Sequence, residues 1–229
     1  MATDICADCT VRDQALCSTL SDLELTRLNA VSRHQSVASG ATLMWAGDES
    51  VVCGNVLSGV LKMTAATADG REQIVGLLYA PDFVGRPQGG ELPFSITALT
   101  DTELCIFPRA PFQQMLDDHL KMERLLLRRT MSALDEARSR MLLLSRGTAE
   151  EKLAGFLLEM FDRAETGPGA ATIELPLSRG QIADVLGLTI ETVSRQVTHL
   201  KNANIIALPG GRSITVLDRN ALQRRSIVD

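Results

Sequence analysis

The stretch from Pro111 to Arg146 constrains this chain most, because after its first residue it contains no glycine and no proline. Proline is favoured at the first position of a helix, so one long helix is expected to begin at Pro111. Apolar residues recur along it at spacings of seven, four, three and seven: Leu120, Leu127, Met131, Leu134 and Met141.

Those spacings are typical of the apolar seam of a coiled coil, and such a helix usually packs against its own copy in a dimer. A long helix buried within one subunit is the alternative interpretation. The seam would next use Arg138, and Asp135 lies beside it. Charge at or beside a seam position sets the register and lowers dimer stability.

The part of the chain before this stretch predicts short strands joined by tight turns. Between residues 36 and 108, turn signals recur at Gly40, Gly47, Gly59, Gly70 and Pro81. Segments such as "GVLKMTA" and "TELCIF" are apolar or β-branched with partial alternation. The pattern favours an antiparallel β-roll or jelly roll over βαβ units.

The part after the long helix predicts a third helix and then two short helices. Thr148 and Glu151 have the spacing of a capping box, and Ser178 and Gln181 repeat it. The segment "ETGPGAAT", which contains Pro168, breaks the third helix and is expected to be a connector. The sequence therefore indicates a separate C-terminal module.

The second short helix follows a turn at Gly187 and begins after Thr189, which is placed to cap it. One face is apolar and is expected to pack inward: Ile190, Val193, Val197 and Leu200. The opposite face carries side chains of the types that read base edges: Glu191, Ser194, Arg195, Thr198 and Asn202. Such a helix fits the major groove, and "IIALPGGRSITVL" predicts a hairpin wing beside it.

The charge of the chain is distributed unevenly. Residues 176–229 hold 7 Lys and Arg against 4 Asp and Glu, whereas residues 1–110 hold 7 against 13. A basic module on an acidic body is expected where one end contacts phosphates and the rest senses something else. A solvated pair of helices without DNA binding is the alternative interpretation of the module.

Length and composition favour a two-domain globular protein, since the 229 residues are 45% hydrophobic and 22% charged. We expect it in the cytoplasm, because there is neither an apolar run that would span a membrane nor a signal peptide. We do not expect an enzyme, because His34, His119 and His199 are scattered and no P-loop or Ser-His-Asp pattern occurs.

Three of the five cysteines lie near the start of the chain: Cys6, Cys9 and Cys17 have the spacing C-x2-C-x7-C. Cys105 lies near the end of the β-rich part, where a folded N-terminal loop would meet it. Four thiolates suit a [4Fe-4S] cluster or a Zn ion, and spacing does not separate the two. A redox disulfide and unremarkable buried thiols are further interpretations. Cys53 is interpreted as an ordinary core residue.

Over nearly its whole length the chain resembles the CRP/FNR superfamily of bacterial transcription regulators. The resemblance rests on "GLTIETVSR" in the two short helices, and on "AGDE", "SGVLKM", "DGREQIVGLL", "DFVGRP" and "MLLLSRGTAEEKLAGFL". It implies an α+β fold in four parts: an N-terminal cluster-ligand loop (1–20), a β-roll sensor domain like the cyclic-nucleotide-binding domains (21–110), a dimerisation helix (111–146) and a winged helix-turn-helix DNA-binding domain (147–229).

The resemblance also implies the roles of particular residues. Glu191, Ser194 and Arg195 match the base-reading residues of FNR-type proteins, whose half-site is TTGAT. In the FNR branch, and particularly in its FnrL and FnrN type, three N-terminal cysteines and one distant cysteine hold a [4Fe-4S] cluster that oxygen destroys. Here these would be Cys6, Cys9, Cys17 and Cys105.

One departure from the superfamily argues against a cyclic nucleotide. Members that bind one carry an Arg-Ser pair after a Gly-Glu, whereas "GGELPFSITAL" has Pro93 and Phe94 and no arginine before Arg109. The expected partners are double-stranded DNA with an inverted repeat, a second copy of the chain and RNA polymerase, with no membrane.

The mechanism expected from these elements is a latch. An intact cluster would tie the N-terminal loop to the β-roll and favour dimer packing of the long helix, and its loss in oxygen would weaken the dimer and DNA binding. The competing hypothesis is a DNA-binding regulator or interaction module with a structural Zn or redox-thiol site.

Overall fold

The computed structural model describes residues 6, 9–67, 69–70, 72–164 and 171–226. The chain divides into two compact units, 1–133 and 134–229, and the division falls inside a helix. The connector predicted around Pro168 lies outside the described residues, as do the first five residues of the predicted ligand loop. Each unit is described by itself.

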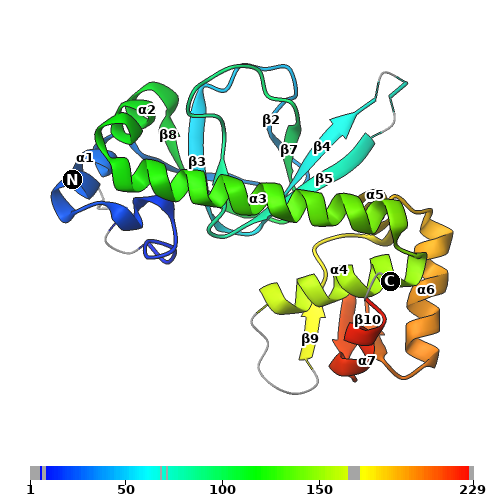
Figure 1. The fold of residues 1–229 in the computed structure, drawn as a ribbon. Helices are drawn as coiled ribbons and strands as arrows, with labels where there is room; N and C mark the ends of the chain where they lie inside the picture. Colours follow the sequence, from blue (N-terminus) through cyan, green and yellow to red (C-terminus); the bar gives the residue numbers. More distant parts are fainter. Residues whose placement is uncertain (1–5, 7–8, 68, 71, 165–170, 227–229) are drawn as a thin grey trace. The chain divides into compact units, whose positions relative to one another are not determined.

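The first unit contains two four-stranded antiparallel sheets, which confirms the predicted β-roll (Figure 1). In order across the first sheet, the strands are β1 (Arg33–Val37), β8 (Thr102–Pro108), β3 (Val52–Ser58) and β6 (Phe83–Val84). In order across the second sheet, they are β2 (Thr42–Met44), β7 (Ser95–Ala98), β4 (Val60–Ala66) and β5 (Glu72–Tyr79).

The β-roll has tight turns where the sequence places glycines. Gly59, between β3 and β4, has φ +85°, and a Cβ atom there would lie 2.4 Å from the carbonyl oxygen of Asp101. Only glycine fits this close approach, because any side chain would collide with the backbone. Apolar side chains from both sheets, including Val56, Leu61 and Leu104, form one of the two buried clusters of this unit.

Four helical segments complete the first unit or begin in it: η1, a 3₁₀ helix (Leu16–Thr19), α1 (Asp22–Val31), α2 (Arg109–Asp118) and α3 (Leu120–Arg146). The second buried cluster joins η1, α1, α2 and the start of α3 to strands β3 and β8. The N-terminal segment is therefore packed against the β-roll.

The prediction of one helix over residues 111–146 is wrong at His119. This residue has φ −124° and ψ 82°, outside the helical region, so α2 ends before it and α3 begins after it. Helix α2 also begins earlier than expected, at Arg109, with Pro111 inside its first turn. A break of one residue leaves no gap in the apolar pattern, which is why the sequence did not indicate it.

The second unit contains the rest of α3 and seven further elements: α4 (Ala149–Arg163), β9 (Ala171–Glu174), α5 (Arg179–Leu186), α6 (Ile190–Asn202), β10 (Ile206–Gly210), β11 (Ser213–Val216) and α7 (Arg219–Arg224). The three strands form one antiparallel sheet in the order β10-β11-β9. The predicted hairpin wing is confirmed by the pairing of β10 with β11. Gly210 is still paired, with Ser213, and the turn is formed by Gly211 and Arg212.

Both predicted capping boxes are present. The Thr148 hydroxyl accepts from the backbone N–H of Glu151 at the start of α4, and Ser178 does the same for Gln181 at the start of α5. Among the described residues, no helix is both long enough and apolar enough to cross a membrane.

Candidate metal centre and nucleic-acid interface

The four cysteines singled out in the sequence line one cavity. Cys6, Cys9 and Cys17 reach it from the N-terminal segment, and Cys105 reaches it from strand β8. The cavity is partly open to solvent, and most of its other walls are apolar. Two segments far apart in the sequence thus bring four sulfur-bearing side chains to one place.

Short-range backbone hydrogen bonds fold the N-terminal segment so that its cysteines line the same cavity. The carbonyl of Cys9 accepts from the N–H of Arg12 at 3.2 Å, and that of Val11 accepts from Ala15 at 2.8 Å. The 3₁₀ turn of η1 follows at once and buries Cys17. Two consecutive turns therefore take up the seven residues between Cys9 and Cys17.

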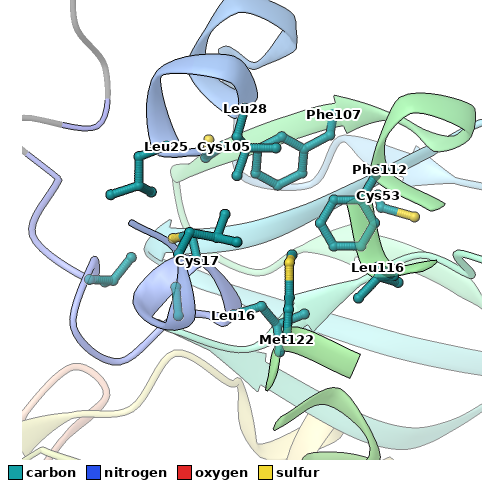
Figure 2. Close-up of a cluster of buried hydrophobic side chains, with 13 residues drawn as sticks. Leu16, Cys17, Leu25, Leu28, Cys53, Cys105, Phe107, Phe112, Leu116 and Met122 are labelled. Atoms are coloured by element: carbon teal, nitrogen blue, oxygen red, sulfur yellow. The ribbon is translucent and has the colours of Figure 1, made fainter. Parts of the chain in front are cut away.

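Cys105 is held on a rigid element, because β8 is an inner strand paired on both sides. Its Cα lies opposite His34 on β1 and opposite Asn55 on β3. Figure 2 shows Cys17 and Cys105 among the buried side chains of the second cluster.

Burial and mutual repulsion disfavour the thiolate form of these cysteines. Burial raises the pKa of the Cys17 thiol to about 11, with smaller contributions from the charges of Cys9 and Cys6. Burial also raises the pKa of Cys105 to about 12, and the other three cysteines add to the shift. Without a bound metal these two thiols are protonated at neutral pH, and a metal ligated there would displace their protons.

The donor set fits a thiolate-ligated group, because four soft sulfur ligands around one apolar cavity suit an iron-sulfur cluster or Zn. No three Cys, His, Asp or Glu side chains within the described part of the chain are already gathered around a single metal position.

The prediction that Cys53 is a core residue is confirmed. It is fully buried on β3, opposite Phe107, and is not part of the cavity lining. Burial raises the pKa of its thiol to about 12.

The cysteine-bearing segment packs directly against the start of α3. Met122 is fully buried in the same cluster as Cys17 and Cys105, and Leu125 and Leu126 pack against that cluster. Further along α3, the guanidinium of Arg129 donates to the backbone carbonyls of Gln14 and Pro81.

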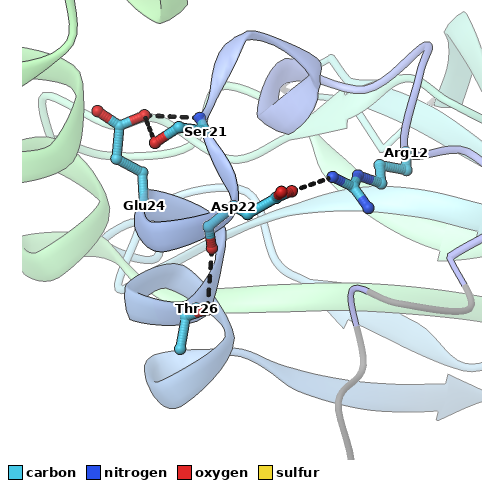
Figure 3. A network of polar contacts seen from close by, with 5 residues as sticks. All are labelled: Arg12, Ser21, Asp22, Glu24 and Thr26. Atoms are coloured by element: carbon cyan, nitrogen blue, oxygen red, sulfur yellow. Dashed lines mark hydrogen bonds and ion pairs between the residues drawn. The ribbon is translucent and has the colours of Figure 1, made fainter.

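Polar contacts of α1 reinforce this packing (Figure 3). The Arg12 guanidinium pairs with Asp22 at 2.9 Å, and Glu24 accepts from both the N–H and the hydroxyl of Ser21. The other carboxylate oxygen of Glu24 lies 3.2 Å from Nδ1 of His119, the residue between α2 and α3. Sequence reasoning missed the Ser21–Glu24 capping box, although its spacing is the same as that of Thr148 and Glu151. It also missed the Glu24–His119 pair, whose partners are 95 positions apart in the chain.

The predicted seam residues of α3 are exposed apolar side chains. Leu127, Met131, Leu134 and Met141 are between 42% and 69% exposed. Beside them Arg138 Nη1 lies 3.2 Å from Asp135 Oδ1, and both of these side chains are also exposed.

In the C-terminal unit, α5 and α6 form a helix-turn-helix. Gly187 ends α5 in the left-handed region at φ 59°, and the Thr189 hydroxyl accepts from the N–H of Thr192 to cap α6. Val193, Val197 and Leu200 are buried, as predicted. Ile190, the first residue of α6, is 49% exposed, so its predicted inward packing is wrong.

The outer face of α6 carries the predicted polar residues. Glu191, Arg195 and Thr198 are exposed, and Ser194 is half-buried. Hydrogen bonds from its own backbone N–H and from Thr189 lower the pKa of Glu191, so this side chain is ionised at neutral pH. Nη1 of Arg179, at the start of α5, lies 3.5 Å from the Ser194 hydroxyl.

Comparison with known protein families assigns both units. Residues 151–225 match the Crp-like helix-turn-helix domain, and residues 34–119 match the cyclic nucleotide-binding domain. Those two matches cover the helix-turn-helix just described and most of the β-roll.

Curated relatives match nearly the whole chain. The transcriptional activator protein FnrL of Cereibacter sphaeroides is 41% identical over 93% of this chain and 88% of its own length. The nitrogen fixation regulation protein FixK of Bradyrhizobium diazoefficiens is 39% identical over 93% and 90%. The solved structure of FixK2 from Bradyrhizobium japonicum superposes with a TM-score of 0.80 at 30% identity, over 87% of this chain and 99% of that one.

The chain belongs to the CRP/FNR family of transcription regulators. It is therefore a regulator with a helix-turn-helix DNA-binding domain and not an enzyme.

Proposed function

We propose that this protein is an oxygen-responsive transcription regulator that binds inverted-repeat DNA as a homodimer while Cys6, Cys9, Cys17 and Cys105 hold a [4Fe-4S] cluster. The observation that carries the proposal is that these four side chains line the same cavity. The 41% identity with FnrL over nearly the whole chain supports it. The identity with FixK is almost as high, at 39%, so sequence identity alone does not identify the sensor, and the proposal rests on the four cysteines.

When bound, the cluster supplies oxygen-labile iron–thiolate bonds between the N-terminal segment and β8. Packing between the N-terminal segment and α3 transmits the loss of the cluster to this helix. With the cysteines fixed at the cavity, Leu16 and Cys17 stay packed in the cluster that buries Met122. When the N-terminal segment is released, this packing is lost and the start of α3 loses its support.

Helix α3 acts as the dimer contact. Leu127, Met131, Leu134 and Met141 would bury their exposed apolar surface against a second copy. The Asp135 and Arg138 charges beside this seam keep the dimer weak enough to be switched. Loss of the dimer weakens DNA binding strongly, because the second half-site is then no longer reached at a high effective concentration.

Helix α6 reads the DNA. Arg195 suits a bidentate contact to guanine, Glu191 accepts from the cytosine amino group, and Ser194 contacts either strand of a TTGAT-type half-site. Thr189 and Thr198 flank these residues on the same helix. We further propose that the regulator acts through RNA polymerase and without a cyclic nucleotide.

Anaerobic purification tests the sensor. We expect the wild-type protein to show a broad visible absorption band, with iron and sulfide in equal amounts, and to elute as a dimer. Replacing any one of the four cysteines by Ser should abolish the band and the anaerobic DNA binding. Cys53→Ala, a buried thiol outside the cavity, is the matched control and should keep both.

Two results would contradict this proposal. Colourless protein that contains Zn would establish the competing structural-metal site. A cysteine variant with normal anaerobic DNA binding would remove that cysteine from the ligand set.

A further inference from the structure

The cavity that the four cysteines line also contains a buried amide. Asn55, on β3, is 2% exposed, and its side chain is part of the cavity wall. Its Oδ1 atom has no hydrogen-bond partner within the described part of the chain. Buried polar groups in folded proteins nearly always have a partner, so an amide whose oxygen lacks one beside a cavity points to something that binds there.

The strand register places this amide beside the sulfur ligands. Asn55 lies directly opposite Cys105 in the antiparallel pair of β3 and β8. Residues that face each other across such a pair project to the same side of the sheet. Asn55 therefore shares its face of the sheet with the cysteine that the β-roll contributes.

The chemistry of an amide suits a sulfur-rich group. Thiolate and sulfide sulfurs accept hydrogen bonds, and the Asn side chain carries an NH₂ group with two donors as well as its oxygen. Half a turn about the last side-chain bond exchanges the two ends of the amide, so either end can face the cavity. Hydrogen bonds to the sulfurs are one of the factors that set the reduction potential of iron-sulfur clusters.

We propose that the Asn55 amide donates a hydrogen bond to the sulfur atoms of the group held by the four cysteines and thereby raises its reduction potential. This inference rests on the proposed function and adds to it a residue that adjusts the reduction potential of the bound group. The donor stabilises the more negatively charged, reduced state.

Asn55→Leu tests the inference, because leucine has nearly the shape of asparagine without its polar atoms. Two quantities are measured under anaerobic conditions: the reduction potential of the reconstituted protein, and the denaturant midpoint of the metal-free protein. Thr64→Val is the matched control, because Thr64 is also buried, its hydroxyl oxygen also lacks a partner among the described residues, and it lies outside the cavity.

We expect Asn55→Leu to shift the potential to a lower value while the metal-free protein keeps or gains stability, since a buried amide whose oxygen lacks a partner is replaced by an apolar group. Asn55→Thr keeps a smaller donor on a side chain that suits a strand, and its potential should lie between those of Asn55→Leu and the wild type. Thr64→Val should leave the potential unchanged.

The inference is overturned if Asn55→Leu has the wild-type potential. It is equally overturned if the metal-free variant is less stable than wild type, because the amide would then serve the fold. Wild-type protein that takes up no iron and sulfide would instead refute the proposed function, and this inference with it. The two failures are therefore distinguishable.

Discussion

At the scale of single residues, two kinds of side chain carry the proposed activity, and both depend on their surroundings. Cys17 and Cys105 are buried, so each is an unreactive thiol unless a metal takes the place of its proton. Arg195 is exposed on α6 and needs only a partner with two acceptors. In the proposed function, sensing thus depends on buried thiols, and DNA reading depends on an exposed guanidinium.

Arg195 gives the prediction at this scale. We expect Arg195→Ala to cost about 1–3 kcal/mol of binding free energy on the matched half-site and to relax the preference at the guanine. Binding to the natural site and to sites changed at that base pair, at one salt concentration, measures this. Equal weakening on all sites would instead identify Arg195 as a phosphate contact. Arg224→Ala, in the last turn of α7, is the charge-matched control.

At the scale of elements, the N-terminal segment and α3 form one packed structure. Met122 supplies the apolar contact, and Arg129 binds the backbone on both sides of the junction, at Gln14 and at Pro81. Gln14 lies between Cys9 and Cys17, so α3 binds the loop that carries the proposed cysteine ligands. This link gives the loop a physical route to α3, the proposed dimer helix.

Arg129→Ala tests that route. Its two contacts are charge-assisted hydrogen bonds to backbone carbonyls, and their loss is expected to destabilise the docked segment by about 1–3 kcal/mol. Hydrogen exchange at residues 9–20 should become faster, and the anaerobic dimer should weaken, while the visible absorption band stays. Arg128→Ala, the exposed neighbour, should change none of these. Unchanged exchange in Arg129→Ala would mean that the link carries no coupling.

Local signals in the sequence predicted most of the elements. The capping boxes at Thr148 and Ser178 and the turn at Gly187 involve residues within a few positions of one another, so their spacing identifies them. The non-helical residue His119 was missed because the apolar pattern runs across it without a gap, and its side-chain contact with Glu24 joins residues 95 positions apart in the chain. Ile190 was misassigned because periodicity does not show where the core ends.

Of the residues at the candidate metal centre, only the four cysteines could be predicted from the sequence. Cysteine is rare enough that four of them with suitable spacing indicate a metal or cluster. Asn55 and Arg129 carry no such signal, because asparagine in a strand and arginine on a helix are usually ordinary surface residues. Asn55 becomes buried only when β3 pairs with β8, and Arg129 finds its partner only when Gln14 lies beside α3. Their roles depend on contacts that composition and periodicity do not describe.

At the scale of the whole molecule, the proposed regulation requires a dimer that forms with the bound cluster and dissociates without it. The seam of α3 offers exposed leucine and methionine side chains, whose burial favours association. Arg138 occupies the next seam position, and its ion pair with Asp135 is exposed in the single chain. Burying that charge in a dimer is unfavourable, so the packed N-terminal segment must supply the remaining stability.

Arg138→Leu should therefore make the dimer independent of the sensor. Replacing the seam charge by an apolar side chain removes its desolvation cost, and on the order of 1–4 kcal/mol of dimer stability is expected. Gel filtration in air should then show a dimer for Arg138→Leu and a monomer for wild type, and only the variant should bind DNA in air. Glu136→Leu adds the same side chain off the seam and should stay monomeric in air. If both variants elute as dimers, general hydrophobicity and not the seam governs association. If both elute as monomers, the Arg138 charge does not limit the dimer, and the prediction is wrong.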